Sequence, residues 1–171
     1  MITPDYCSTM ARYGWWQNES LVTAADGLSP EDRAMDRGAF FGGISDTLNH
    51  LLWADMIWMS RFDGGEAPKG AISDSKTTIP DWPMFKAKRA EVNARILTWA
   101  DTLTATELEG ELAWFAMSLG RELSKPKVLC IAHMFNHATH HRGQIHAMLT
   151  AAGARPDDTD LIILPKDERW L

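Results

Sequence analysis

The segment from His133 to Met148 constrains the fold of this chain most strongly, because five of the six histidines lie within it. Pro126 precedes the segment and Pro156 follows it, so a single helix is predicted over residues 126–152. Residues four apart lie nearly above one another on a helix. One stripe of this helix therefore carries Cys130, Met134, His137, His141, Ile145 and Met148. Two histidines thus occupy positions where the pattern predicts apolar core residues.

Three further segments, residues 5–27, 44–62 and 81–104, carry apolar residues at helical spacing. The second of them is apolar over most of its circumference, which is typical of a buried helix. Residues 64–80 are rich in glycine, proline, serine and threonine and are predicted to form an exposed loop. Residues 105–125 fit either a short extended pair or a helical turn, because their apolar run is brief and a glycine follows it.

These four helical patterns, with almost no strand signal, predict an all-α fold. We expect a single domain over residues 1–171, built as a four-helix bundle with long connections between its helices. The length and the hydrophobic content of 45% suit one domain with a sizeable core. Four adjacent apolar residues, Leu161–Leu164, predict a docked C-terminal tail, since they would otherwise be exposed.

The composition argues against several classes of function. The formal net charge is −6, and no patch of lysine and arginine interleaved with aromatic residues occurs, so nothing favours nucleic-acid binding. No apolar run reaches about 18 residues, and the N-terminus lacks a signal-peptide pattern, so we expect no membrane partner and a cytoplasmic location. Two cysteines far apart in sequence, Cys7 and Cys130, give no disulfide framework.

The paired histidines of the stripe indicate a metal site. A buried imidazole without a partner costs about 1–3 kcal/mol, whereas two imidazoles one helical turn apart can converge on one ion. His137 and His141 have this spacing, but no glutamate lies between them, so the zincin metalloprotease motif is absent. No Asp or Glu occurs from Leu123 to Pro156, which excludes a di-iron carboxylate site. Neutral nitrogen ligands favour Zn, Ni, Co, Cu or Fe over Ca or Mg.

His50 is the one histidine outside this run, and it lies midway along the buried pattern 44–62, where a third ligand would be useful. Three protein nitrogens with one open position are typical of catalytic zinc. A histidine on an apolar face is also commonly a satisfied core residue, so a histidine cluster without metal stays an alternative. His133 and His140 lie to one side of the stripe and fit the rim of a pocket. Arg142, also off the stripe, fits a surface or interface salt bridge.

Four segments resemble the DinB-like family, which is related to the YfiT-like metal-dependent enzymes. They are Asn136–Gln144 (NHATHHRGQ), Tyr13–Glu19 (YGWWQNE), Ser45–Asp55 (SDTLNHLLWAD) and the tail Asp158–Leu161. The resemblance implies a four-helix bundle with an unusual helix connection and a divalent metal, commonly nickel or zinc, in a three-histidine site. Carried onto the matching positions of this chain, it implies that the metal ligands are His50, His137 and His141.

Two interpretations of function stay open. The first is an enzyme in which a metal-activated thiol or water acts on a small electrophile, as in the thiol-dependent S-transferases of the family or in a hydrolase. Its partners would be a small-molecule substrate and a low-molecular-weight thiol, with Trp53, Trp58 or Trp114 as aromatic walls. No catalytic residue can be named. The alternative is a non-catalytic, stress-associated metal-binding protein that forms a homodimer, in which the ion links two helices.

Overall fold

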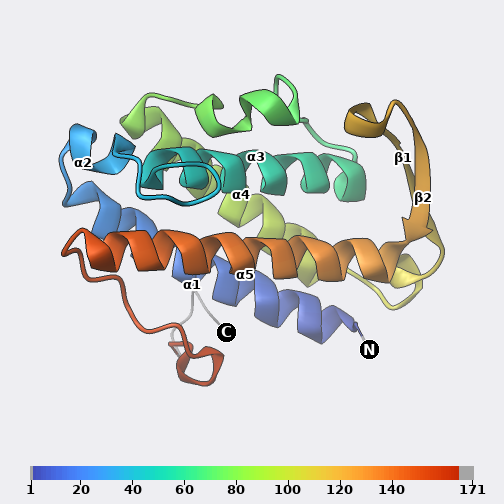
Figure 1. Ribbon diagram of the computed structural model, residues 1–171. Helices are drawn as coiled ribbons and strands as arrows, with labels where there is room; N and C mark the ends of the chain where they lie inside the picture. The colour runs from blue at the N-terminus through green and yellow to red at the C-terminus, as the bar shows by residue number, and fades with distance from the viewer. Residues whose placement is uncertain (1, 166–171) are drawn as a thin grey trace.

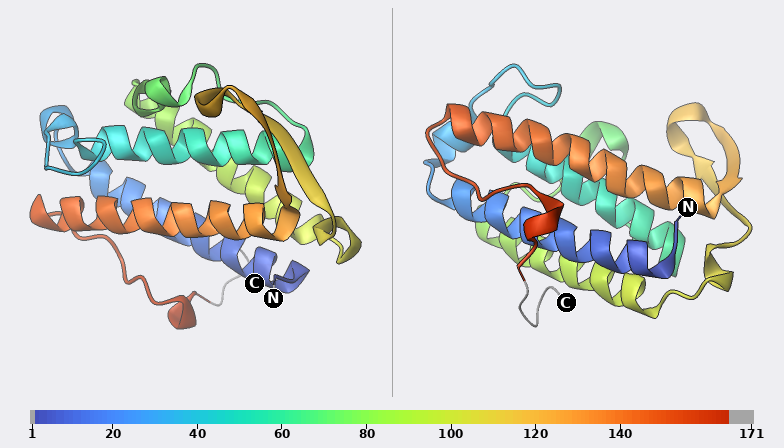
Figure 2. Two further views of the ribbon diagram at one scale, coloured as in Figure 1. Left: turned by 45° about the vertical axis from the view of Figure 1, so that its right-hand side comes forward. Right: turned by 90° about the horizontal axis from the view of Figure 1, so that it is seen from below.

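The computed structural model describes residues 2–165, apart from the side chain of Ser118, and most of these residues are helical. The four long helices are α1 (Pro4–Asp26), α3 (Ile44–Asp63), α4 (Trp82–Thr102) and α5 (Lys127–Ala151). Helix α1 packs against α4 and α5, and α3 packs against α4 and α5 (Figure 1). The two further views show the same side-by-side arrangement, with α3 and α5 running in opposite directions (Figure 2). All four predicted helices are confirmed, with ends that differ by one or two residues.

Local sequence signals account for the helix ends. Thr3 begins α1, where its side-chain oxygen accepts a hydrogen bond from the backbone N–H of Tyr6 at 3.1 Å. Asp81 begins α4 in the same way and accepts from the N–H of Met84 at 2.9 Å. Such caps satisfy N–H groups that have no partner within the helix, and they contribute about 1 kcal/mol each. At its other end α3 stops at Gly64, whose φ of 71° is accessible to glycine at little cost.

The core lies between the four helices. Its fully buried apolar side chains include Leu21, Ile44, Leu51, Leu52, Met59, Phe85, Ile131, Ile145 and Leu149. Burial of one such side chain contributes about 1.5–3 kcal/mol. As predicted for a helix that is apolar on most sides, α3 is enclosed over several consecutive positions, from Thr47 to Leu52.

A β-hairpin precedes α5 and corrects the all-α prediction. Its strands are β1 (Glu111–Ala116) and β2 (Arg121–Pro126), which pair antiparallel with Trp114 opposite Leu123. Along β1 the more buried positions alternate with exposed ones, which is the period of a strand with one covered face. The hairpin is the short extended pair that the sequence left open, and Figure 2 shows it projecting beyond the start of α5.

The shorter elements lie in the connections. They are the helix α2 (Pro30–Ala34) and the 3-10 helices η1 (Ile72–Thr77), η2 (Thr106–Leu108), η3 (Met117–Leu119) and η4 (Leu161–Ile163). Although residues 64–80 are mostly exposed, as predicted, η1 packs against α3 and buries Ser75. Within the described chain, no helix is both long and apolar enough to cross a membrane.

The C-terminal tail docks on α1 through hydrogen bonds to its backbone. The side chains of Tyr13 and Gln17 donate to the carbonyl oxygens of residues 159 and 158, at 2.7 and 2.9 Å. Ser20 accepts a bond from the N–H of Asp157 at 2.7 Å. Successive members of these three α1 side chains are about one helical turn apart, so they hold the tail along one face of the helix.

The apolar run of the tail does not behave as predicted. Leu164 packs beside Tyr13 and Trp16, but Ile162 is 93% exposed and both of its neighbours are at least 40% exposed. Docking through Leu161–Leu164 is therefore wrong for most of that run. The physical reason is that the polar side chains of α1 fix the tail by its backbone, which leaves η4 standing out from the surface.

Candidate metal centre

His50, His137 and His141 are brought together by two antiparallel helices. His50 lies on α3, and the other two lie one turn apart on the facing side of α5. One ring nitrogen from each of the three residues lies within 4.8 Å of the other two. His50 and His141 are buried, and His137 is partly exposed. The structure thus assembles the three residues that the family resemblance implied as ligands.

The spacing of the ring nitrogens suits a metal ion. The Nε2 of His137 lies 3.4 Å from that of His50 and 3.1 Å from that of His141. An ion bound tetrahedrally with metal–nitrogen bonds of about 2.0–2.1 Å separates its ligand nitrogens by about 3.3 Å. Both spacings are close to this value, and the ligand atoms of His50 and His141 lie within 4.8 Å of each other, so the three histidines can converge on one ion. Their neutral nitrogen donors suit a transition metal such as Zn or Ni better than Ca or Mg.

Two polar side chains orient the rings through the Nδ1 atoms, which lie on the side of each ring away from the cluster. The Nδ1 of His50 lies 2.9 Å from Ser75 Oγ, and the Nδ1 of His141 lies 2.8 Å from Gln144 Oε1. An amide oxygen can only accept, so His141 carries its proton on Nδ1 and turns the lone pair of Nε2 toward the cluster. The same tautomer of His50, with Nδ1–H donating to Ser75, does likewise. His137 can donate only one hydrogen to these two lone pairs, whereas a cation satisfies all three nitrogens.

A loop before α3 covers one side of the cluster. Phe41 stacks on the ring of His50, with centroids 3.8 Å apart, and its ring centroid lies 5.5 Å from that of His141. The following Gly43 starts α3 where a Cβ would lie 2.8 Å from a backbone carbonyl oxygen, so only glycine fits there. Gly42 has a φ of 90°, which also favours glycine. These two glycines let the loop turn back tightly enough to bring Phe41 over the histidines.

Burial keeps the imidazoles neutral. Burial, together with the charges that the neighbouring histidines would carry, lowers the pKa of His137 to about 3. It lowers the pKa of His50 to about 4, aided by the charge that His141 would carry. The pKa of His141 also falls through burial, and its bond to Gln144 opposes this change. All three rings are therefore unprotonated at pH 7, the form in which histidine binds metals.

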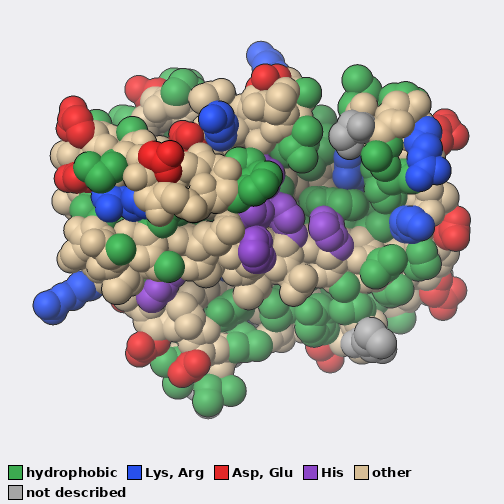
Figure 3. All heavy atoms as spheres, viewed as in Figure 1, with side chains coloured by type: hydrophobic (Ala, Val, Ile, Leu, Met, Phe, Trp, Pro, Cys, Tyr) green, Lys and Arg blue, Asp and Glu red, His purple; other side chains and the backbone are tan. Residues whose placement is uncertain are grey.

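A cavity of about 530 Å³ opens beside the cluster and is lined by His50 and His137. Its other walls come from α3, α5, the hairpin and the start of η1, and they include Trp53, Trp58 and Trp114. These are the three tryptophans that the sequence suggested as aromatic walls. Figure 3 shows histidine side chains gathered in the middle of one face, next to a hollow with hydrophobic walls. Its volume falls in the usual range for small-molecule sites, about 300–1,000 Å³.

The sequence matches the profile of the DinB family over residues 1–169. The chain belongs to the DinB family. It is 22% identical over 170 residues to Protein DinB of Bacillus subtilis (strain 168), and the match covers 91% of each chain. It also resembles the crystal structure of a DinB-like protein from Bacillus cereus ATCC 10987, with a TM-score of 0.60 and 18% identity over 84% of this chain and 90% of that one. At such identity the likeness to the solved structure establishes the fold alone.

Two further histidines of this DinB family chain, His133 and His140, lie beside the cluster, and His133 occupies the predicted place at the edge of the cavity. His133 lines the cavity, where its ring lies 5.1 Å from Trp58 and 5.5 Å from His137. His140 is exposed, and its ring lies 5.0 Å from that of His141. Burial lowers the pKa of His133, and the charge of Arg61 lowers it further.

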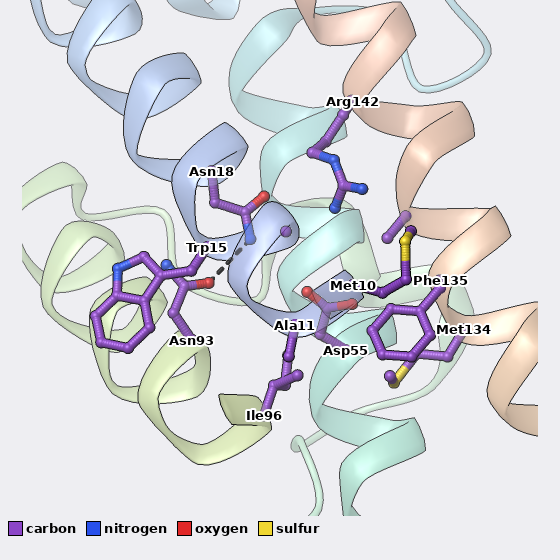
Figure 4. A pocket seen from close by; sticks show the side chains of 12 residues that line it. Met10, Ala11, Trp15, Asn18, Asp55, Asn93, Ile96, Met134, Phe135 and Arg142 are labelled. Atoms are coloured by element: carbon purple, nitrogen blue, oxygen red, sulfur yellow. Dashed lines mark hydrogen bonds between the residues drawn. The ribbon is translucent and has the colours of Figure 1, made fainter. Parts of the chain in front are cut away.

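Arg142 is buried and not at the surface, contrary to the prediction. Its Nη2 donates to Thr139 Oγ1 at 3.1 Å, and its guanidinium lies 5.5 Å from the ring centroid of Tyr13. Figure 4 shows Arg142 and Asp55 pointing into one small cavity between the four long helices. Asp55 in turn accepts a bond from Arg89 Nη1 at 2.7 Å. Burial lowers the pKa of Arg142, and the negative charge of Asp55 opposes this change.

Three residues that contact the cluster were not singled out as site residues in the sequence, although one of them ends the family-like segment Asn136–Gln144. They are Phe41, Ser75 and Gln144. Phe41 belongs to a pair of phenylalanines next to Gly42-Gly43, and an apolar pair in a glycine-rich connection could have indicated a loop that turns inward. Ser75 lies in a segment rich in small polar residues, where one buried hydroxyl cannot be distinguished from its exposed neighbours.

Proposed function

We propose that this DinB family protein is a divalent-metal-dependent enzyme in which His50, His137 and His141 hold Zn or Ni. We further propose that it acts on a small electrophile in the cytoplasm, as a thiol-dependent S-transferase or a hydrolase, and that its four long helices form the bundle typical of such a site. One observation carries the proposal. A cluster of three neutral imidazoles lies at the wall of a cavity large enough for a small molecule.

The ion would supply Lewis-acid chemistry, which makes a thiol or a water more acidic at neutral pH. The side chains around the ion would orient its ligands, cover the cluster and bind the substrate. Ser75 and Gln144 hold the rings of His50 and His141 so that their Nε2 lone pairs converge. Phe41 covers one side of the cluster and excludes water there. The tryptophan walls favour a substrate with an apolar or aromatic part.

The first experiment measures metal content by mass spectrometry on untagged protein, beside the variants His50→Ala and His137→Ala. The proposal expects nearly one Zn or Ni per chain in the wild type and loss of that metal in both variants. His146→Ala is the matched control, because His146 lies on the same helix outside the cluster. A folded, metal-free wild type that cannot be reloaded with either metal would contradict the proposal.

The second experiment measures turnover of a model electrophile with a panel of low-molecular-weight thiols and with water alone. Thiol-dependent turnover that disappears in His137→Ala supports a transferase, and thiol-independent turnover supports a hydrolase. A metal-loaded protein that is inert across the panel favours the alternative, a non-catalytic metal-binding protein.

That alternative includes a homodimer, and one observation favours a second subunit. The hairpin, its turn and the adjoining first turn of α5 expose the apolar side chains of Phe115, Met117, Leu119 and Leu129, the first three of them at the edge of the cavity. Exposed apolar residues close together commonly mark an interface. The mass of the protein in solution, measured by light scattering during gel filtration, distinguishes a dimer from a monomer. Substitution of Phe115 and Leu129 by serine is expected to convert a dimer of this kind into monomers.

A further inference from the structure

Arg61 places a positive charge in the cavity beside the histidines. It lies in the last turn of α3 and lines the cavity together with His50 and His137. Its guanidinium carbon lies 4.6 Å from the ring centroid of Trp58 and 5.1 Å from that of Trp114. The two rings therefore fix the guanidinium at the aromatic wall of the cavity, by contacts that arginine commonly makes with tryptophan.

Within residues 2–165, Arg61 makes no ion pair or hydrogen bond to another side chain or to the backbone. Other arginines of these helices are paired: Arg12 with Asp101, Arg89 with Asp55 and Arg95 with Asp63. The residues that line the cavity include neither Asp nor Glu. A partly buried guanidinium keeps its charge and has five N–H donors, so this one lacks an anionic acceptor.

The positions along α3 place this charge at a distance from the histidine cluster. His50, Ala54, Trp58 and Arg61 line the cavity at spacings of three or four residues, so they share one stripe of the helix. At a rise of 1.5 Å per residue, the backbone of Arg61 lies about 16 Å from that of His50 along the helix axis. On α5, which runs the opposite way, His137 and His133 line the same stretch. The histidine cluster thus lies toward one end of this stripe, and Arg61, whose guanidinium lies over Trp58, lies toward the other.

We propose that this cavity binds an elongated small molecule whose carboxylate pairs with Arg61, whose apolar middle packs on Trp58 and Trp114, and whose other end reaches the three histidines. The inference rests on the proposed function, because it concerns the ligand of that same site. A single guanidinium matches one carboxylate in charge and in its fork of donors. A doubly charged phosphate would leave one charge unbalanced among apolar walls, since no lysine lines the cavity.

The experiment uses three probes of equal chain length in isothermal titration calorimetry with the purified protein and its bound metal. 8-Mercaptooctanoate carries both a thiol and a carboxylate. 8-Mercaptooctan-1-ol lacks the carboxylate, and octanoate lacks the thiol. We expect the mercapto acid to bind at least about tenfold more tightly than the mercapto alcohol, because a charge-assisted pair forms only with the acid.

Two variants assign this preference to Arg61. Arg61→Met keeps an unbranched stem against the tryptophans and removes the charge, so the two thiols are expected to bind within about threefold of each other. Arg61→Lys keeps the charge without the fork of donors and is expected to retain part of the preference. Arg121→Met is the matched control, because Arg121 is an exposed arginine of the hairpin outside the cavity. It is expected to bind all three probes as the wild type does.

The failure of this inference can be told apart from the failure of the proposed function. If Arg61 does not bind the carboxylate, the acid and the alcohol bind equally to the wild type, or Arg61→Met leaves their ratio unchanged. If instead the histidines hold no metal, the thiol adds no affinity over octanoate, and His137→Ala changes nothing, while the preference for the carboxylate persists. Absence of binding by all three probes overturns the inference.

Discussion

The Nδ1 of His50 lies 2.9 Å from the Oγ of Ser75, so a hydroxyl from the short helix η1 orients a ring nitrogen of α3. Ser75 is buried, whereas the residues on either side of it are exposed. Hydrogen bonds of this kind fix the tautomer of a ligating histidine, and their loss typically lowers metal affinity 10- to 100-fold. The bond thus connects the fold of a surface segment to the chemistry of the cluster.

We therefore expect Ser75→Ala to lower the affinity for Zn or Ni by about 10- to 100-fold. The measurement is a competition titration with a chromogenic chelator. Ser73→Ala, in the same 3-10 helix, is the control, because its exposed hydroxyl contacts only Asp74. Equal affinities of the two variants would mean that η1 plays no part in holding the metal ligand.

The depressed histidine pKa values predict how the stability of the metal-free protein depends on pH. His50 and His137 titrate near 6.5 when unfolded and near 4 and 3 when folded. Between these values the unfolded chain binds more protons, so the free energy of unfolding increases with pH. The contribution of these two histidines to the free energy of unfolding is fully present above about pH 6.5. It falls progressively as the pH decreases toward 4 for His50 and toward 3 for His137.

Urea unfolding of chelator-treated protein at pH 7.5, 5.5 and 4.5 measures this dependence. The midpoint is expected to fall from each pH to the next. In the double variant His50→Gln with His137→Gln, the urea midpoint should change less between these pH values, because glutamine does not titrate. A wild-type midpoint that is the same at all three values would contradict the depressed pKa values.

Much of the fold could be predicted because helices repeat their pattern many times. Each of the four long helices has 20 or more residues, so several turns contribute to its apolar stripe. The hairpin could not be predicted with the same certainty. Its strands have six residues each, and the alternation of Leu112, Trp114 and Ala116 is too short to exclude a helical turn.

The candidate site could be predicted only in the parts that regular spacing carries. His137 and His141 share a stripe of one helix, and His50 lies midway along the most buried one. Phe41 and Ser75 reach the cluster from connections, where no period relates the sequence to the direction of a side chain. The burial of Arg142 depends on another helix, since its guanidinium lies beside Gly14 and Tyr13 of α1.

The ion pair of Asp55 and Arg89 predicts a large loss of stability when one charge is removed. Both side chains are less than 10% exposed, and their atoms lie 2.7 Å apart. Asp55→Asn would leave the buried guanidinium groups of Arg89 and Arg142 without their negative neighbour. Breaking a buried pair in this way typically costs about 3–5 kcal/mol.

A surface pair provides the control for this loss. Asp63 and Arg95 are also 2.7 Å apart, but their side chains are 24% and 22% exposed. Asp63→Asn is expected to cost about 1 kcal/mol or less. Denaturant unfolding of the two variants at pH 7 provides the comparison. Equal losses would show that Asp55 does not act as the counter-charge of the buried arginines.

Gly143 predicts a gain in stability on substitution. It lies in the interior of α5 and is exposed, and a Cβ at this position would have no heavy atom within 4 Å. Alanine is favoured over glycine in a helix interior by about 1 kcal/mol. For a protein of this size, that gain corresponds to an increase of about 2–4 °C in the midpoint of thermal unfolding.

Scanning calorimetry of Gly143→Ala, with sedimentation velocity on the same sample, measures both stability and association. A higher midpoint with unchanged mass fits a face open to solvent. A lower midpoint together with dissociation of a dimer would instead mean that a second copy of the chain packs closely against Gly143, because only then would an added methyl group meet another molecule.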